Sequence, residues 1–249
     1  MKLKTNVFAN RAARVARLSL GAVSLATVAM AWMPQTMRAQ NLVLDNFQTG
    51  AGKVQAVSGS QGVNQTGAGI VGGTRGISIV YNPAAPSVFG QLSTLQVRPS
   101  ADPKTVPPAL IWSNGFGVVP GIEVEYFGLN DDTPLNLDLT DYDRFRLSFD
   151  GTSTGVVLTA EVWYGGDFNL YGAESCGLPA SNHPFTLDIP FSAFAPGLAP
   201  ITWSSLDGLF FELTEGTSPL NSPNLAITGF YAIPATDPAG TITCGPPAT

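Results

Sequence analysis

The sequence is poor in charged side chains and has few of the residues on which most enzyme active sites depend. Charged residues make up 12% of the 249 positions, with one histidine and two cysteines. That histidine, His183, precedes a proline in a turn-rich stretch, whereas zinc sites need several His or Cys ligands. No serine stands in a G-x-S-x-G motif, so the nucleophile of that class of hydrolase is missing. We therefore expect neither a zinc site at His183 nor a serine hydrolase triad.

Basic residues are scarce beyond the N-terminal segment. Six of the twelve Lys and Arg residues lie within the first 39 positions, and all eighteen acids follow them. The six remaining bases against eighteen acids give the rest of the chain a net charge of −12. Such a chain repels nucleic acids and anionic lipid surfaces. The hydrophobic fraction of 44% is too high for a disordered chain.

The first 39 residues have the layout of a secretory signal peptide. Five basic residues between Lys2 and Arg17 precede an uncharged apolar run from Leu18 to Met33, and small-residue cleavage options follow at Ala31 and Ala39. The apolar run is too short for a comfortable membrane span, and no second one follows. We expect a protein that is secreted or periplasmic after signal removal, with no membrane span in the mature chain.

The two cysteines, Cys176 and Cys244, most simply form one disulfide in an exported protein, and a pair of unlinked thiols is the alternative. Closing so long a loop would stabilise the fold by about 4 kcal/mol on the chain-entropy estimate. We expect the bond to tie the polar tail 234–249 to a loop around Cys176, because the tail has little apolar content of its own.

Beyond residue 40, no stretch of ten or more residues repeats with the 3.6-residue period of a helix. Short β-branched and aromatic runs alternate with polar residues, and Gly, Pro, Asn and Ser separate them. This pattern predicts one all-β domain over residues 40–249, an antiparallel β-sandwich of jelly-roll type. Residues 58–73 and 99–108 are rich in Gly or Pro and are expected to be loops. The expected strands are 42–47, 53–57, 76–81, 91–98, 109–112, 118–127, 142–150, 156–164, 185–190, 209–214 and 225–233.

One β-hairpin is expected about the turn-forming segment 150–155. Symmetrical folding sets Leu147 opposite Leu158 on the core face, with Phe145, Phe149, Val156 and Ala160 as their neighbours. The other face then pairs Arg144 with Glu161 and Tyr142 with Trp163, and it also carries Arg146.

Several segments resemble galactose-binding-like jelly rolls, the fold of many carbohydrate-binding modules. Residues 44–47 read L-D-N-F, like the opening "D-D-F" strand of that family, and residues 138–147 are similar to its "D-L-S-x-Y-D-x-L-x-F" segment. Residues 185–194 and 203–209 match the "I-P-L-S-x-F … D-W-S-x-V-D-x-I" stretch. Residues 69–75 resemble the "I-L-G-G-x-R" of a group of uncharacterised exported bacterial proteins. The resemblance spans residues 42–233 and implies a carbohydrate-binding jelly roll.

The resemblance also implies a structural calcium, held by the acid of the first strand together with an Asp pair on the last. Asp45 is that first acid, but residues 225–230 contain no acid, so Asp45 lacks its expected partner. Other oxygen ligands stand at 130–132 and at Asp138, Asp141 and Asp143, without the spacing of a dedicated calcium loop. Asp138 and Asp141 equally suit turn capping. We predict no cofactor and leave a structural calcium open.

Two further motifs offer chemistry. Residues 67–72 spell G-x-G-x-x-G, but the segment after them is strand-like, so a flexible glycine loop is favoured over a dinucleotide site. Glu123 and Glu125 lie on one face of a strand, about 7 Å apart along it. Retaining glycosidases use two carboxyls about 5–5.5 Å apart, so the pair is a candidate, although solvent-face carboxylates are the simpler interpretation.

The outer face of the expected hairpin, with the nearby Tyr171, joins aromatic rings to hydrogen-bonding side chains, as sugar binding requires. The alternative is that Trp163 and Tyr171 only pack the loop 165–170 over the edge of the sandwich. We expect a non-catalytic exported binding protein for carbohydrate or cell-surface glycan. The alternatives are a polysaccharide-acting glycoside hydrolase using Glu123 and Glu125, and a structural matrix or surface-assembly protein. The predicted ligand-binding residues are Tyr142, Arg144, Arg146, Glu161, Trp163 and Tyr171.

Overall fold

The computed structural model describes residues 39–81, 91–115, 120–128, 133–166, 170–215 and 224–244. The predicted signal peptide and its cleavage sites fall outside these residues or at their first position, so both stay predictions, as does the extent of the domain. All eleven expected strands are present in the described residues, which contain no α-helix. The strands are β1 (Leu42–Asp45), β2 (Gly52–Ala56), β3 (Ser60–Thr66), β4 (Thr74–Tyr81), β5 (Ser93–Arg98), β6 (Ala109–Asn114), β7 (Pro120–Phe127), β8 (Arg144–Thr152), β9 (Val156–Tyr164), β10 (Leu170–Leu178), β11 (Phe185–Pro190), β12 (Ala195–Pro196), β13 (Leu206–Glu215), β14 (Asn224–Ile233) and β15 (Ile242–Thr243).

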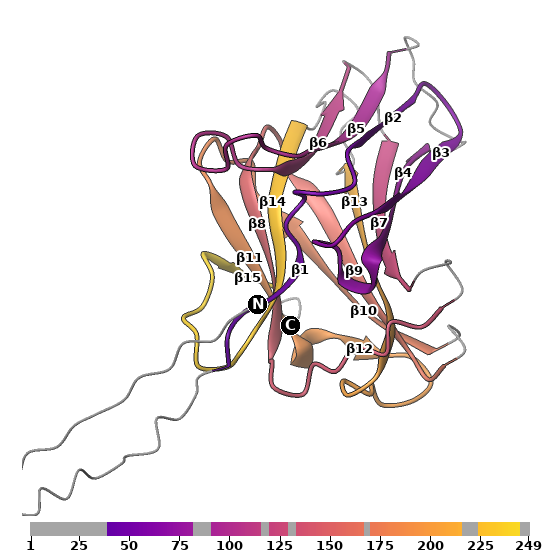
Figure 1. The fold of residues 1–249 in the computed structure, drawn as a ribbon, viewed down its shortest axis with the longest axis vertical. Coiled ribbons are helices and arrows are strands. Elements are labelled where there is room, and N and C mark those ends of the chain that lie inside the picture. The colour runs from indigo at the N-terminus through magenta and orange to yellow at the C-terminus, as the bar shows by residue number, and fades with distance from the viewer. Residues whose placement is uncertain are drawn as a thin grey trace, which may run out of the picture. The chain divides into compact units, whose positions relative to one another are not determined.

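The strands form two sheets that pack face to face (Figure 1). The first sheet has the order β15-β11-β8-β14-β6-β5-β2, with β1 also paired to β14, and the second has the order β12-β10-β9-β13-β7-β4-β3. All pairings are antiparallel except that of β11 with β15. The predicted all-β antiparallel sandwich of jelly-roll type is confirmed.

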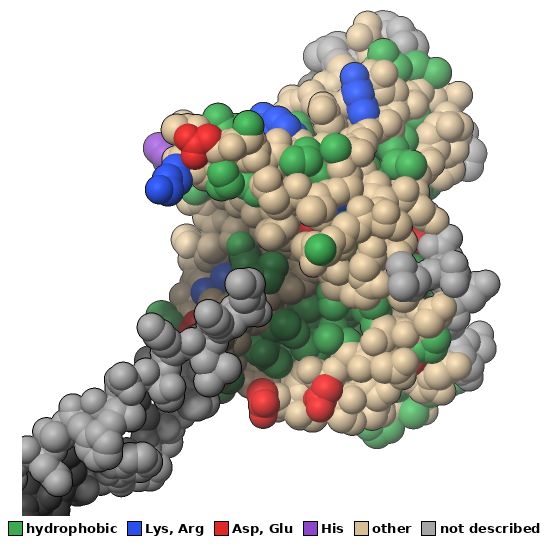
Figure 2. All heavy atoms as spheres, viewed as in Figure 1, with side chains coloured by type: hydrophobic (Ala, Val, Ile, Leu, Met, Phe, Trp, Pro, Cys, Tyr) green, Lys and Arg blue, Asp and Glu red, His purple; other side chains and the backbone are tan. Residues whose placement is uncertain are grey.

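Period-2 alternation builds the core from both sheets. On β8, Phe145, Leu147 and Phe149 are buried, and β9 buries Val156, Leu158, Ala160 and Val162 in the same way. Burial of such side chains is the main favourable term in folding. The outward positions of both sheets carry mostly polar residues, with some aromatic and aliphatic ones such as Tyr171 and Ile111. Few of them are charged on the face drawn in Figure 2.

The predicted hairpin about residues 150–155 is wrong. Strand β8 pairs with β11 and β14 in the first sheet, and β9 pairs with β10 and β13 in the second. The turn therefore carries the chain from one sheet to the other. The expected core residues are buried, but they face one another across the sandwich instead of lying side by side. Consequently Arg144 and Glu161 project from opposite outer faces and do not form a pair.

Four strands lie outside the eleven expected ones: β3, β10, β12 and β15. Residues 58–73 were expected to be a loop, yet β3 occupies part of this segment, with Gln65 as its one buried side chain. β10 has Gly172, Ala173, Ser175 and Gly177 along its length. Such strands bury too little apolar surface to show alternation, and hydrogen bonding to their neighbours holds them instead.

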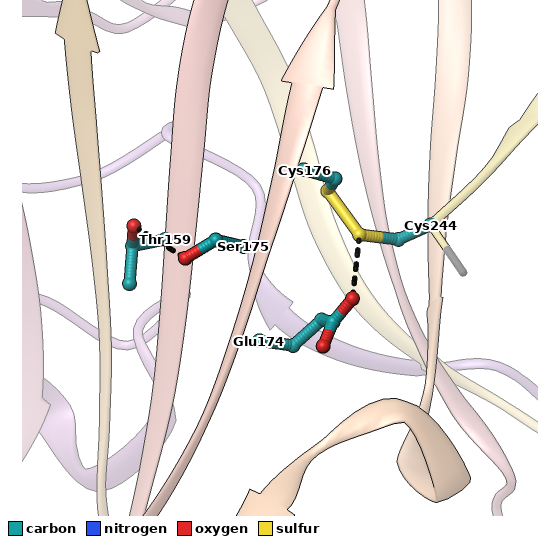
Figure 3. The surroundings of a disulfide bond; sticks show 5 residues. All are labelled: Thr159, Glu174, Ser175, Cys176 and Cys244. Atoms are coloured by element: carbon teal, nitrogen blue, oxygen red, sulfur yellow. Dashed lines mark hydrogen bonds between the residues drawn. A yellow bond between two sulfur atoms is a disulfide. The ribbon is translucent and has the colours of Figure 1, made fainter. Parts of the chain in front are cut away.

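The C-terminal segment is fastened to the first sheet. Cys176 and Cys244 form the predicted disulfide, with their Cα atoms 5.7 Å apart (Figure 3). Cys176 lies in β10 and not in the expected loop, so the bond joins the β10 side of the second sheet to the segment after β15. The Cys244 N–H also donates to the Asp188 carbonyl oxygen at 2.7 Å. In the part of the chain that is described, no helix is long and apolar enough to cross a membrane.

Candidate functional site

Three of the predicted ligand-binding residues lie on the outer face of the second sheet, and the structure brings them to the predicted glutamate pair. Glu161 and Trp163 point outward from β9, as do Glu123 and Glu125 from β7, with β13 between these strands. We call this surface the acidic face. It consists of the outward side chains of Ser78, Glu123, Glu125, Thr159, Glu161, Trp163, Tyr171, Ser175, Phe210 and Glu212.

Strand register arranges these side chains in rows across the sheet. One row runs Ser78, Glu123, Glu212, Thr159, Ser175, each residue directly opposite the next. The Ser78 hydroxyl donates to Glu123 Oε2 at 2.7 Å. At the other end, Thr159 and Ser175 share a hydrogen bond of 2.9 Å, drawn in Figure 3. Because neighbouring strands are about 4.8 Å apart, this row of five strands extends about 19 Å.

The carboxylates of the face influence one another. Burial raises the pKa of Glu161, and the charges of Glu212 and Glu123 raise it further. Burial likewise raises the pKa of Glu212, with Glu123, directly opposite it, as the second cause. Desolvated like charges gathered on one surface are typical of functional sites, although structural networks also produce them.

Aromatic rings stand beside these carboxylates. Trp163 and Tyr171 are opposite each other on β9 and β10, with ring centroids 5.4 Å apart and planes inclined by 33°. Tyr171 is exposed and Trp163 is half-buried. Phe210 lies opposite both Glu161 and Glu125. The Trp163 Nε1–H is buried and has no hydrogen-bond partner among the described residues. The face therefore combines ring surfaces with carboxylate and hydroxyl groups.

A hollow of about 350 Å³ opens at the β3 end of the face. Glu123 and Glu125 line it together with Ser78 and Asn64. Gly62 and Gly76 leave the floor of the hollow without side chains. The hollow thus extends the hydrogen-bonding surface beyond the central carboxylates.

The other three predicted ligand-binding residues are on the first sheet. Arg144 and Arg146 project from the outer face of β8, and both are engaged by protein groups. Arg146 makes a bidentate pair with Asp188 at 2.6 and 2.7 Å and donates to the Pro238 carbonyl oxygen. Arg144 pairs with Asp143 and Asp188 and donates to the carbonyl oxygen of Asp237. These arginines hold the segment after β14 against the sheet.

Tyr142 precedes β8 and is half-buried against the core. The six predicted residues therefore do not form one surface, because the hairpin that was to unite them is absent. Glu161, Trp163 and Tyr171 lie together on the second sheet, whereas Arg144 and Arg146 lie on β8 of the first sheet and Tyr142 in the segment before it. Whether any of them binds a ligand stays a prediction.

The sequence analysis did not identify Glu212 and Phe210. They lie on β13, between the glutamate pair of β7 and the predicted ligand-binding residues of β9. Both occur in the expected strand 209–214, whose alternation places them outward. A cross-strand partner depends on sheet order, however, and no local pattern in the sequence carries that order.

Asp45 does not fit a calcium site. Its carboxylate forms a buried ion pair with the Arg75 guanidinium, accepts the Phe47 N–H at 2.7 Å and accepts the Tyr126 hydroxyl at 3.0 Å. Burial, and then the charge of Asp45, raise the pKa of Tyr126 well above its usual value, so its hydroxyl remains a donor. Arg75 also donates to Gln65 Oε1. Fixed donors thus surround the carboxylate, and a cation already neutralises it.

The remaining candidates have structural positions. Asp138 accepts hydrogen bonds from the backbone and side chain of Thr140, which lower its pKa and cap the turn. Residues 130–132 lie outside the described part. Residues 67–72 lead into a 3₁₀ turn and then β4, with no α-helix after them. The described residues contain no group of three or more His, Cys, Asp or Glu placed to hold a metal ion.

Comparison with known proteins finds resemblance in structure. No protein-family model and no curated protein sequence matches the chain. Among solved structures, a family 11 carbohydrate-binding module from Clostridium thermocellum, in complex with a β-1,3-1,4-mixed-linked tetrasaccharide, is 11% identical. That match has a TM-score of 0.44 and covers 80% of this chain and 98% of that one.

Two further structures show similar relationships. The family 11 module of a cellulosomal cellulase from the same organism is 11% identical, with a TM-score of 0.43 and coverage of 79% of this chain and 96% of that one. An exo-β-agarase is 9% identical, with a TM-score of 0.41, and the match covers 81% of this chain and 25% of the agarase. The predicted resemblance to carbohydrate-binding jelly rolls is thus found in structures, but at these identities and TM-scores it transfers no ligand or site.

Proposed function

We propose that the protein is an exported, non-catalytic carbohydrate-binding protein and that a glycan chain lies across the acidic face. The observation that carries the proposal is the meeting of three aromatic rings and four carboxylates on one sheet face. Ring faces cover the C–H surfaces of a sugar, and carboxylates and hydroxyls bond its hydroxyl groups. The rows across the strands suit an extended chain, and the disulfide accords with an oxidising compartment outside the cytoplasm.

The charge of the face narrows the ligand to neutral glycans. No Lys or Arg projects outward from the described residues of β3, β4, β7, β9, β10, β12 or β13, so no basic side chain of these strands offsets the charges of Glu123, Glu161 and Glu212. A uronate or sulfated chain would meet charges of its own sign and pay for desolvation as well. A neutral chain instead presents hydroxyl groups, which can donate to these carboxylates.

A glycan-array screen of the secreted protein, followed by titration calorimetry with the best neutral ligand, tests this proposal. Tyr171→Ala should weaken binding by about 1–3 kcal/mol, as loss of a stacking ring does. Tyr142→Ala is the control, because it removes the same type of side chain from the segment before β8, away from the acidic face, and the affinity of this variant should equal that of the unmodified protein. Equal affinities in both variants, or weakening by Tyr142→Ala alone, would place the ligand elsewhere.

Hydrolysis is the second candidate, and the raised pKa values of Glu161 and Glu212 favour keeping it. Glycosidases need one carboxyl that holds its proton near neutral pH and one that is ionised. Reducing-end release from neutral polysaccharides would be the readout. Release that disappears in Glu123→Gln or Glu212→Gln, while binding persists, would replace the non-catalytic assignment.

A further inference from the structure

A second hollow, of about 780 Å³, lies on the outer face of the first sheet, on the opposite side of the sandwich from the acidic face. Its floor crosses three neighbouring strands, because Ala226 of β14 stands between Ile111 of β6 and Gly151 of β8 in register. Gly151 has φ of 138°, and a Cβ there would lie 2.9 Å from the Ser181 carbonyl oxygen. The floor is therefore kept low at this strand. We call the hollow the second groove.

Three exposed side chains at the edges of the second groove have no partner among the described residues. Arg98 of β5 lies on one side, and Asp150 of β8 and Asn182 lie on the other, with β6 and β14 between them. Arg98, Asp150 and Asn182 line the groove and are exposed. Among the described residues, none of these three side chains has a hydrogen-bond or ion-pair partner. The guanidinium, the carboxylate and the amide are thus all available to a ligand.

Arg98 differs in this respect from the other described arginines. Arg75 is buried against Asp45, while Arg144 and Arg146 share Asp188. Each of those three guanidinium groups is already paired with a carboxylate of the protein. Arg98 stands at the end of β5, over the groove, and has no such partner among the described residues.

Hydrogen bonds among Ser113, Asn224 and Ser153 hold one end of the groove in place. The Ser113 hydroxyl donates to Asn224 Oδ1 at 2.7 Å. The Asn224 N–H donates to Ser153 Oγ at 2.8 Å, and the Ser153 N–H donates to the Asn224 carbonyl oxygen at 2.9 Å. These bonds tie β6, β14 and the turn after β8 together. A ligand would meet a wall that is already ordered, which lowers the entropic cost of binding.

The chemistry of the second groove suits a neutral saccharide. A guanidinium donates two parallel N–H bonds, a carboxylate accepts from two hydroxyls, and an amide does both. The opposite charges of Arg98 and Asp150, on the two sides of the groove, leave its lining without net charge. Ile111 and Ala226 give an apolar floor for a ring, and the volume lies within the usual range of ligand sites.

We propose that the second groove binds a neutral saccharide independently of the acidic face, so that one molecule holds two glycan chains. The proposal of two sites rests on the proposed function, which supplies the first site on the acidic face. Binding in the second groove does not depend on it. Because the two sites point away from each other across a rigid sandwich, one short chain cannot reach both. The molecule would therefore cross-link separate chains, and its avidity for a polysaccharide would exceed the affinity of either site.

The test uses the secreted protein and four hexasaccharides, those of cellulose, β-1,3-glucan, agarose and chitin, in titration calorimetry. We expect two saccharides bound per protein. Ala226→Trp, which fills the floor, should reduce this to one. Arg98→Gln should weaken binding in the groove by about tenfold to a hundredfold, the usual effect of losing hydrogen bonds from a charged group. Lys53→Gln is the control, since it removes one exposed positive charge from the same sheet at β2, away from the groove.

Each outcome separates the two sites. Trp163→Ala should leave the groove site intact, and precipitation of the parent polysaccharide should require both sites. If Ala226→Trp abolishes all binding and Trp163→Ala leaves binding unchanged, the result supports the groove and refutes the acidic face. One saccharide per protein, with affinity unchanged in Ala226→Trp and Arg98→Gln, would refute the groove. Binding of none of the four hexasaccharides would refute both. Arg98→Gln, at an exposed position, decides the matter if Ala226→Trp fails to fold.

Discussion

At the scale of single residues, cross-strand register sets the environment of each glutamate on the acidic face. Glu212 stands directly opposite Glu123, and Glu161 responds to the charges of both. Like charges held opposite each other in a sheet oppose folding. That the surface keeps such residues despite this cost supports the proposed binding role of the acidic face.

The first prediction concerns the pH dependence of this cost. The pKa of Glu212 is raised in the folded protein, so the folded state holds this proton more tightly than the unfolded state does. The contribution of Glu212 to the free energy of unfolding therefore falls as pH rises through the folded pKa, and it stays low above it. Glu212→Gln should stabilise the protein at pH 7 by about 0.2–1 kcal/mol, the usual size of such a pair.

The gain from Glu212→Gln should disappear by about pH 4, where the native glutamate is itself protonated. Urea denaturation at both pH values measures the difference. An equal gain at pH 7 and pH 4 would mean that the effect is packing rather than charge.

The second prediction concerns the buried ion pair of Asp45 and Arg75. Removing one partner leaves an uncompensated buried charge, so Arg75→Met should cost about 3–5 kcal/mol of stability. Arg98→Met makes the same change at an exposed position without a partner among the described residues, and it should cost little.

Because Arg75 already neutralises Asp45, a chelator should leave the midpoint of thermal unfolding unchanged. A fall in that midpoint on chelation would show that a metal contributes to stability.

At the scale of elements, alternation predicted each face correctly and the pairing of β8 with β9 incorrectly. Leu147 and Leu158 are both buried, as they would be in a hairpin and as they are across a sandwich. Period-2 patterns report which side of a strand meets the core, but they do not report which strand lies beside it. The sequence therefore predicts the acidic face one strand at a time. It cannot show that β13 lies between β7 and β9 and so places Glu212 between Glu123 and Thr159.

The third prediction tests the faces of β8. Leu147 is buried between the sheets, so Leu147→Ala should cost about 2–5 kcal/mol. Ser148→Ala, on the outer face of the same strand, should cost little. Arg146→Ala, also on the outer face, should have an intermediate cost, because Arg146 binds both Asp188 and the Pro238 carbonyl oxygen. Chemical denaturation of the three variants gives the order, and equal costs at Leu147 and Ser148 would overturn this assignment of faces.

At the scale of the whole molecule, the C-terminal segment connects the two sheets along one side. Asp188 and the arginines of β8 hold it to the first sheet, and the disulfide ties it to the second. Asp188 of β11 receives both arginines of β8, the Gly240 N–H at 2.6 Å and, through its carbonyl oxygen, the Cys244 N–H. The disulfide then continues from Cys244 to β10 of the second sheet. The composition correctly predicted that the disulfide ties down the polar tail. Arg144 and Arg146, which also hold this segment, were instead predicted to bind a ligand.

The last prediction separates these two supports. Thiol labelling of unfolded, unreduced protein should find no free cysteine. Replacing both cysteines by serine should lower the free energy of unfolding by about 4 kcal/mol, because the bond closes a loop of 68 residues in the unfolded chain. The ionic contacts of Asp188 remain in that variant, so the segment 234–244 should stay docked and resist limited proteolysis. Asp188→Asn in the oxidised protein should do the reverse: the segment becomes cleavable while Cys244 stays bonded to Cys176. Rapid cleavage of the segment in the serine variant would instead mean that the disulfide alone holds it to the sandwich.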